Sequence, residues 1–306
     1  MPVSSSFSRD FFLFVFIIII GYILKKAKVL KKEDAHVLAT IIMNITLPCA
    51  LLTSANGIEL SGLIIVLIII GILSNIIMIF IGYFASLKES NQLKAAFMIN
   101  TSGYNIGNFA LAFIQSFFPG LGVVYLCSFD IGNALMGLGI TYAMASHVAS
   151  GENHFQVSDL FKKLFSSIPF DVYILIFIFA IFKIKIPDSI LSIASTIGAG
   201  NSFLAMLMIG LLLELKISPT ETKNVIKVLV LRIIGTIILS LLTYFILPIP
   251  ILAKKIMIMA YCAPLSTVSA VFSKKIGYDG DMPAVANSLS IILGVICMTI
   301  LLILFI

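Results

Sequence analysis

Tryptophan is absent from this chain of 306 residues, and charged residues are scarce. Asp, Glu, Lys and Arg make up 11% of the chain, whereas a soluble domain carries roughly 25%. Hydrophobic residues make up 60%, and the mean hydropathy is +1.15. One water-soluble core cannot bury that much apolar surface, so the excess is expected to face lipid. The composition therefore excludes a soluble domain and predicts an integral membrane protein.

Cysteine is also rare, and catalytic motifs are missing. The four cysteines, Cys49, Cys127, Cys262 and Cys297, lie in apolar segments without metal-ligand spacing, so we expect neither a disulfide framework nor a metal site. No HExxH motif occurs, and the nearest match to GxGD is YDGD at 278–281, with tyrosine where glycine is required. We predict no enzymatic activity and no cofactor.

Arginine occurs only at Arg9 and Arg232, so the net charge of +6 comes mainly from lysine. The lysines are dispersed between apolar runs rather than gathered in one patch, which argues against a nucleic-acid partner. A spanning helix needs about 20 mainly apolar residues. Divided at charges and at Pro/Gly clusters, the chain predicts ten transmembrane helices, numbered 1 to 10, near residues 8–25, 35–56, 60–87, 93–117, 121–146, 168–183, 188–214, 223–247, 254–274 and 282–306.

The distribution of positive charge predicts the orientation. With the N-terminus outside, the outer segments hold five basic residues, Arg9, Lys183, Lys185, Lys254 and Lys255. The cytoplasmic connections then hold fourteen: Lys25, Lys26, Lys28, Lys31, Lys32, Lys88, Lys94, Lys162, Lys163, Lys216, Lys223, Lys227, Lys274 and Lys275. Because cytoplasmic loops carry the excess of Lys and Arg, we expect a multi-pass protein of the cell membrane with both termini outside and a cytoplasmic central loop.

That central loop, 147–167, is the long polar connection, and it divides the chain into halves of five helices each. Because five is odd, the halves 1–146 and 168–306 would insert in opposite orientations, as in many secondary transporters. Weak similarities support an inverted repeat: NITLP at 44–48 with NSFLA at 201–205, and LKAAFMI at 93–99 with AKKIMIM at 253–259.

Polar residues interrupt helix 4, where NTSGYNIGNFA occupies 100–110, and Pro264 interrupts helix 9. In lipid, a broken helix persists only where it is buried in protein or lines a cavity. We therefore expect helices 4 and 9 to cross at the bilayer midplane, with half-helix N-termini directed at an anion. The alternative is a GxxxG packing face and a simple proline kink. The predicted substrate-binding residues are Asn44, Asn100, Thr101, Ser102, Gly103, Asn105, Gly107, Asn108, Pro264, Leu265, Ser266 and Thr267.

Two charged residues lie within predicted membrane segments. Asp130 in helix 5 is a candidate to bind a proton, or to bind sodium together with Asn133, because an intramembrane carboxylate is costly and usually functional; the alternative is a structural acid. Arg232 in helix 8 is a candidate counter-charge for a substrate carboxylate, although it could also pair with an acid or extend toward the cytoplasmic interface.

These features resemble the auxin efflux carrier family, which includes plant PIN-formed carriers and prokaryotic malonate or malate permeases. The resemblance rests on NIGNFAL in helix 4, Asp130 to Asn133 in helix 5, and APLSTVSAVFSKKIGYD in helix 9. It implies a fold related to bile-acid:sodium symporters, with scaffold helices 1, 2, 6 and 7 that often form a dimer surface. Helices 3, 4, 5, 8, 9 and 10 would then form a transport domain.

By the same resemblance, the helix-4 crossover motif is matched by Asn105, Gly107 and Asn108, and the helix-9 proline by Pro264. Ala112 departs from the family, which often has proline there, so substrate specificity cannot be carried over. We predict a secondary active transporter of a small carboxylate or dicarboxylate, auxin-like or malate/malonate-like, with H+ or Na+ as coupling ion and a homodimer through helices 1, 2, 6 and 7. The alternatives are a sodium-coupled symporter of a larger amphipathic anion, a channel, or a receptor on the same fold.

Overall fold

A computed structural model describes residues 3–55, 62–150, 158, 162, 164–166, 168–182, 184–213 and 221–305. Over these residues the chain is helical and contains no strand. Most of the predicted central loop, 147–167, lies outside the described residues. The all-helical fold class is confirmed.

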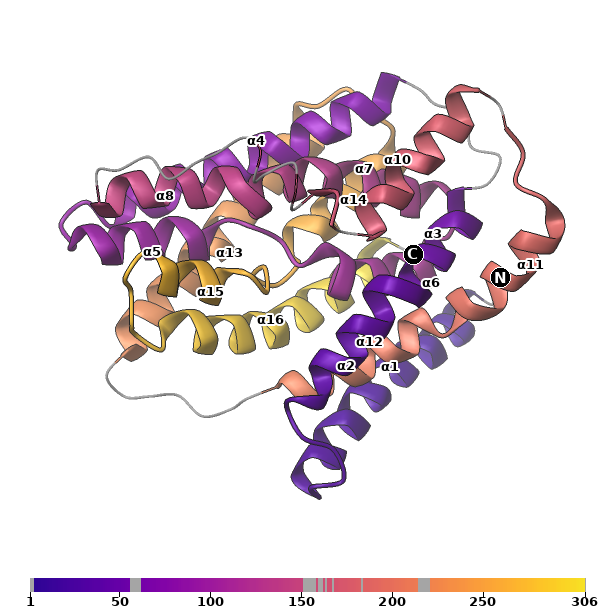
Figure 1. The fold of residues 1–306 in the computed structure, drawn as a ribbon, viewed down its shortest axis with the longest axis horizontal. Helices are drawn as coiled ribbons and strands as arrows, with labels where there is room; N and C mark the ends of the chain where they lie inside the picture. Colours follow the sequence, from indigo (N-terminus) through magenta and orange to yellow (C-terminus); the bar gives the residue numbers. More distant parts are fainter. Residues whose placement is uncertain are drawn as a thin grey trace.

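Helices from the beginning of the chain pack against helices from its middle (Figure 1). This first group contains α1 (Val3–Lys26), α2 (Asp34–Ile41), the π-helical turn η1 (Ile42–Thr46), α3 (Leu47–Ala55), α10 (Ile168–Ile181), α11 (Asp188–Ala199) and α12 (Asn201–Leu212). Within it, α1 and α2 contact α12, while α3 contacts α10 and α11. Two of these helices, α1 and α12, approach each other closely at Gly21 and Gly210, where a Cβ on either residue would meet the backbone of the other. Small residues of this kind allow membrane helices to pack closely.

The remaining helices form a second group (Figure 1). It contains α4 (Gly62–Ala85), α5 (Asn91–Thr101), η2 (Ile106–Ala110), α6 (Leu111–Phe117), α7 (Leu121–Leu135), η3 (Met136–Ile140), α8 (Thr141–Ser150), α13 (Thr222–Phe245), α14 (Ile251–Tyr261), α15 (Ser269–Lys275) and α16 (Met282–Phe305). Here α4 packs on α5 and α7, and α13 packs on α14 and α16.

A chain of amide hydrogen bonds joins the two groups at α6. Thr46 donates to Asn201 at 3.0 Å, Asn201 donates to Gln115 of α6 at 3.1 Å, and the Gln115 amide donates to the Gly198 carbonyl at 3.3 Å. Buried amides satisfy each other in this way where no water is present. The second group is therefore attached to the first through α6 and η1.

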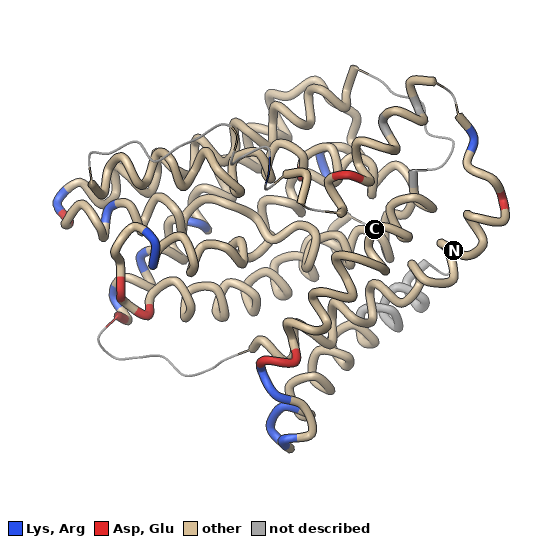
Figure 2. Tube along the Cα trace, in the orientation of Figure 1, with Lys and Arg blue, Asp and Glu red and all other residues tan. Residues whose placement is uncertain are grey.

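The outer surface of the helices is apolar. Among the described residues, six helical segments are long and apolar enough to cross a membrane: Asp34–Ser54, Gly62–Ala85, Leu121–Ser150, Asp188–Leu212, Thr222–Phe245 and Met282–Phe305. Large side chains such as Phe16, Ile65 and Phe245 are more than half exposed, which only a lipid surround makes favourable over so wide an area. Charged residues lie mostly at helix ends and in connections (Figure 2). The chain is a multi-pass membrane protein.

Two local expectations differ from the structure. Asn44 and Pro48 are residue types that predict a break in helix 2, but the helix continues through both, with a π-helical turn at Ile42–Thr46. Such a turn accommodates the missing N–H of proline without ending the helix. Helix 7 does divide, between Ala199 and Asn201. Helix 5 extends to Ser150, four residues beyond the predicted end.

Candidate functional site

Helices 4 and 9 are both interrupted, as the sequence predicts, and the interruptions touch. After α5 ends at Thr101, residues 102–105 leave the helix before η2 begins, and residues 262–268 separate α14 from α15. The backbone N–H of Asn105 donates to the carbonyl of Pro264 at 3.0 Å. We call this meeting of 102–105 with 262–268 the junction. A straight GxxxG packing face, the alternative for Gly103 and Gly107, is wrong, because Gly103 is not helical.

Gly103 permits the turn out of α5. Its φ is +71°, in the left-handed region, where L side chains are strained. A Cβ built on Gly103 would lie 3.1 Å from the Cβ of Ser266 on the opposite side of the junction. The position thus requires glycine for backbone conformation and for space.

Gly103→Ala is therefore expected to lower the free energy of unfolding by about 1–2 kcal/mol, because the alanine must adopt this φ and displace Ser266. Thermal unfolding of the purified protein in detergent measures the effect. Gly107→Ala is the matched control, since its Cβ would meet Leu47 Cδ2 at 3.5 Å, an ordinary contact. Equal melting temperatures for the two variants would contradict this account of the turn.

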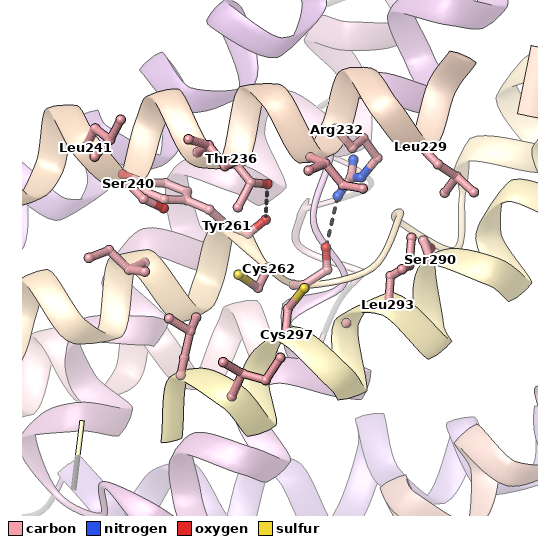
Figure 3. Close-up of a pocket in the computed structure, with 17 residues that line it drawn as sticks. Leu229, Arg232, Thr236, Ser240, Leu241, Tyr261, Cys262, Ser290, Leu293 and Cys297 are labelled. Carbon is pink, nitrogen blue, oxygen red and sulfur yellow. Dashed lines mark hydrogen bonds between the residues drawn. The ribbon is translucent and has the colours of Figure 1, made fainter. Parts of the chain in front are cut away.

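Arg232 of α13 holds the two broken helices together. Its Nη1 donates to the carbonyls of Thr101, Ser102 and Gly103 at 2.8, 3.1 and 3.0 Å, and its Nη2 donates to the carbonyl of Ala263 at 2.9 Å. Figure 3 shows this last bond beside the bond of 2.9 Å from Thr236 to the Tyr261 carbonyl. Carbonyls at the end of a helix have no intrahelical partner and carry partial negative charge. The buried guanidinium therefore caps the C-terminal ends of α5 and α14.

Two asparagine side chains form hydrogen bonds with the remaining main-chain groups of residues 103–104. Asn75 of α4 accepts the N–H of Gly103 at 2.8 Å. Asn133 of α7 accepts the N–H of Tyr104 at 3.1 Å and donates to its carbonyl at 2.9 Å. One amide thus satisfies both backbone groups of Tyr104, as a neighbouring strand would. Asn133, expected to bind an ion with Asp130, also positions the junction.

A cavity of about 200 Å³ lies on one side of the junction. It adjoins the beginnings of η2 and α15. Seven predicted site residues line it: Asn105, Gly107, Asn108, Asp130, Asn133, Ser266 and Thr267. The other lining residues come from several helices: Met43, Leu47, Tyr104, Ile106, Ala134, Gly137, Leu138, Pro169, Phe170, Tyr173 and Val268. Both helix groups therefore contribute to one small, partly polar chamber.

Asp130 faces this cavity and is half-buried. Its Oδ1 accepts from Asn133 Nδ2 at 2.9 Å, and its Oδ2 accepts from the Tyr173 hydroxyl at 3.3 Å. No Lys or Arg among the described residues forms an ion pair with Asp130. Such a carboxylate is costly in a membrane interior unless it binds a proton or a cation. Asn108 adds an amide oxygen without a hydrogen-bond partner at the same cavity.

The remaining predicted residues lie away from the cavity lining. Asn100 donates to Ser273 of α15 at 2.8 Å, Thr101 to the Met78 carbonyl at 3.0 Å, and Ser102 to the Met98 carbonyl at 2.8 Å. Gly103, Pro264 and Leu265 belong to the junction itself, and the Leu265 N–H donates to Ser290. Asn44 is exposed and donates to the Thr40 carbonyl. The structure places these residues in supporting contacts.

Two contributing residues escaped the sequence analysis. Asn75 lies beside Ser74 in the largely apolar stretch 62–85, and this polar pair could have marked the position. Tyr173 lies in an apolar segment without any such mark.

Residues 6–156 match the family model described as membrane transport protein. A comparison with curated proteins found no match. The matched part of the chain contains the interruption at 102–105 together with Asp130 and Asn133, so the family match covers the first half of the site.

Proposed function

The chain belongs to the membrane transport protein family, the family of auxin efflux carriers and PIN-like transporters, and we propose that it is a secondary active transporter of a small organic anion. The substrate is a carboxylate or dicarboxylate, of auxin-like or malate/malonate-like chemistry, that binds at the cavity beside the junction and crosses by alternating access. The observation that carries the proposal is this cavity, which joins two interrupted helices to the Asp130 carboxyl group, for which the described residues supply no ion-pair partner.

The anion would bind where helices begin. η2 and α6 form a continuous helical stretch, 106–117, whose first residues line the cavity, and α15 begins immediately after Thr267 and Val268. Helix N-termini present N–H donors and partial positive charge, which suit an anion. The C-terminal ends of α5 and α14 are capped by Arg232, so the negative ends of these helices are compensated. Asn105, Asn108, Ser266 and Thr267 would add hydrogen bonds.

Asp130 is the proposed coupling site. A proton on its carboxyl, or a sodium ion held with Asn133, would offset the substrate charge in the same chamber. The alternative of a sodium-coupled symporter for a larger amphipathic anion differs in its ion requirement. Transport that depends on sodium at fixed pH would favour that alternative, while channel currents or ligand binding without flux would favour a channel or a receptor.

The proposed architecture is ten membrane segments in two inverted halves, with helices 4 and 9 crossing at the midplane. Helix bounds support it at one offset, 160 residues. α4 and α13 begin at 62 and 222 and end at 85 and 245, while α5 and α14 begin at 91 and 251 and end at 101 and 261. The packing repeats as well, because α4 contacts α5 and α7 while α13 contacts α14 and α16. The six candidate spans leave out four of the ten predicted segments: the two broken helices, whose pieces are short, and the segments at α1 and α10.

The first helix group is the proposed scaffold, and the second is the proposed transport domain. The scaffold corresponds to segments 1, 2, 6 and 7, which form the proposed homodimer surface. α11 supports this assignment, because it exposes Ser189, Ser192, Ser195 and Thr196. Exposed small and polar residues on a membrane helix favour packing against another helix rather than lipid.

The proposed orientation has both termini outside the cell membrane and the central loop in the cytoplasm. Contacts between connections support the grouping of segments by side on which this orientation depends. The Lys25 ammonium bonds to the Leu213 carbonyl at the end of α12, and Lys227 pairs with Glu89 at 3.3 Å. Lys255 bonds to the Phe305 carbonyl at the end of α16. Each contact joins two positions that the charge distribution assigns to the same side of the membrane.

Asn105→Ala and Pro264→Ala are expected to weaken carboxylate transport in proteoliposomes by about tenfold, a loss of roughly 1.4 kcal/mol. The first removes a polar side chain from the cavity, and the second loosens the backbone at the junction. A thermal-shift screen with dicarboxylates, auxin-like acids and bile-acid-like anions, with and without sodium, first identifies the substrate. Asn91→Ala, on the exposed beginning of α5, is the control. If both variants transport as the unmodified protein does, the site assignment fails.

A further inference from the structure

A second cavity, an apolar groove of about 400 Å³, lies among α13, α14 and α16. Its lining includes Arg232, Thr236, Tyr261, Cys262, Gly294 and Cys297. It contains none of the residues that line the proposed substrate cavity. The groove contains two of the four thiols in the chain, and the proposed transport function assigns no role to either.

The two thiols come from different helices and converge. Cys262 directly follows α14, which ends at Tyr261, and Cys297 lies within α16. Figure 3 shows both cysteine side chains among the groove residues, Cys262 beside the end of α14 and Cys297 on α16. Both cysteines are free, partly exposed and part of the groove lining.

The backbones of the two segments also approach each other closely beside the thiols. A Cβ built on Gly294 would lie 3.2 Å from the Cys262 carbonyl oxygen and 3.1 Å from Pro264 Cγ. Residues three apart share one face of a helix, so Cys297 follows Gly294 on the face that meets Cys262. Disulfides form where Cα atoms lie roughly 4.4–6.8 Å apart and the side chains face each other. The absence of a side chain at Gly294 allows this approach.

We propose that Cys262 and Cys297 form an oxidation site, a dithiol that a hydroperoxide converts to a disulfide across the groove. One thiol attacks the peroxide oxygen to give a sulfenic acid and an alcohol. The second thiol then attacks the sulfenic sulfur and releases water. In total, two thiols and one hydroperoxide give one disulfide, one alcohol and one water. The groove is apolar, so an apolar hydroperoxide is the oxidant it suits.

The disulfide would restrain the junction on the side that faces the groove. Cys262 precedes Ala263, whose carbonyl binds Arg232, and Pro264, whose carbonyl binds Asn105. α16 already contacts the junction through Ser290, which accepts a hydrogen bond from the Leu265 N–H. A disulfide would add a covalent bond between α16 and the residue that follows α14. Oxidation would restrict relative movement of α14 and α16.

The test treats the purified full-length protein in detergent with tert-butyl hydroperoxide. The free thiols are expected to fall from four to two per chain, and peptide mass spectrometry under non-reducing conditions should find the Cys262 and Cys297 peptides joined. Dithiothreitol should restore four thiols. Cys49→Ser and Cys127→Ser are matched controls, because neither residue lines the groove, and each should still lose two thiols.

Cys297→Ser should abolish the crosslink and leave Cys262 to oxidise singly. If the unmodified protein gives no joined peptide, or if Cys49 is lost as fast as the pair, the assignment is overturned. The readout is chemical and requires no transport. Failure of the transport proposal would leave this result intact, and failure of the crosslink would leave the transport proposal intact.

Discussion

Arg232→Ala is expected to lower the free energy of unfolding by about 4 kcal/mol and to abolish transport. The substitution leaves the carbonyls of Thr101, Ser102, Gly103 and Ala263 without their donor, in a region that water reaches poorly. It also removes the positive charge that offsets the C-terminal ends of two helices. Thermal unfolding in detergent and uptake in proteoliposomes measure the two effects.

Arg232→Lys separates this capping role from the counter-charge role considered in the sequence analysis. Lysine keeps the charge but lacks the planar fork that reaches several carbonyls. If Arg232 caps the helices, the lysine variant should also unfold at a lower temperature than the unmodified protein, although at a higher one than the alanine variant. If Arg232 instead binds substrate, the alanine variant should keep its melting temperature and lose only affinity. That second pattern would contradict the capping role.

Asp130→Asn is expected to remove the pH dependence of transport and to lower its rate by about tenfold or more, since one factor of ten corresponds to about 1.4 kcal/mol. A carboxyl group can bind and release a proton, whereas an amide cannot. With aspartate in place, acidification of the loading side should raise uptake, because more carboxyl groups then carry a proton. With asparagine, uptake should be the same at each pH. The amide oxygen can still accept the bond from Asn133, and the amide NH2 can donate to the Tyr173 hydroxyl oxygen, so the fold is expected to persist.

Asp171→Asn is the matched control, because Asp171 is exposed in the first turn of α10 and does not line the cavity. Its pH profile should follow that of the unmodified protein. Measurements with and without sodium at fixed pH complete the set. An Asp130→Asn variant that keeps its pH dependence would remove Asp130 from proton coupling, and a selective loss of sodium dependence would assign it to the cation instead.

The interruptions in helices 4 and 9 were predictable because their cause is local. Three asparagines and two glycines within 100–110 oppose a regular helix in lipid, and Pro264 lacks an N–H. Apolar runs likewise place the spans to within a few residues. The proposed pairing of the halves also has a sequence signal, but a weak one, because apolar helices resemble each other by chance.

Partners across the fold were not predictable, because a side chain's environment depends on distant segments. Asn44 and Asn105 are both asparagines within predicted membrane helices, yet the first is exposed and the second lines the cavity. Arg232 lies 129 residues or more from the α5 carbonyls that it binds. Nothing in its neighbouring residues indicates that it caps helices.

The contacts that join the two broken helices are made largely to main-chain atoms: Asn105 N–H to the Pro264 carbonyl, Arg232 to four carbonyls, and Asn133 to both groups of Tyr104. Every residue type other than proline offers the same N–H and C=O. The side chains at 105, 108, 266 and 267 can therefore be exchanged while the frame that carries them is kept. Related chains could thus come to transport a different substrate through a few substitutions. A mutant library designed to alter selectivity should vary these four positions and leave Asn75, Asn133 and Arg232 unchanged.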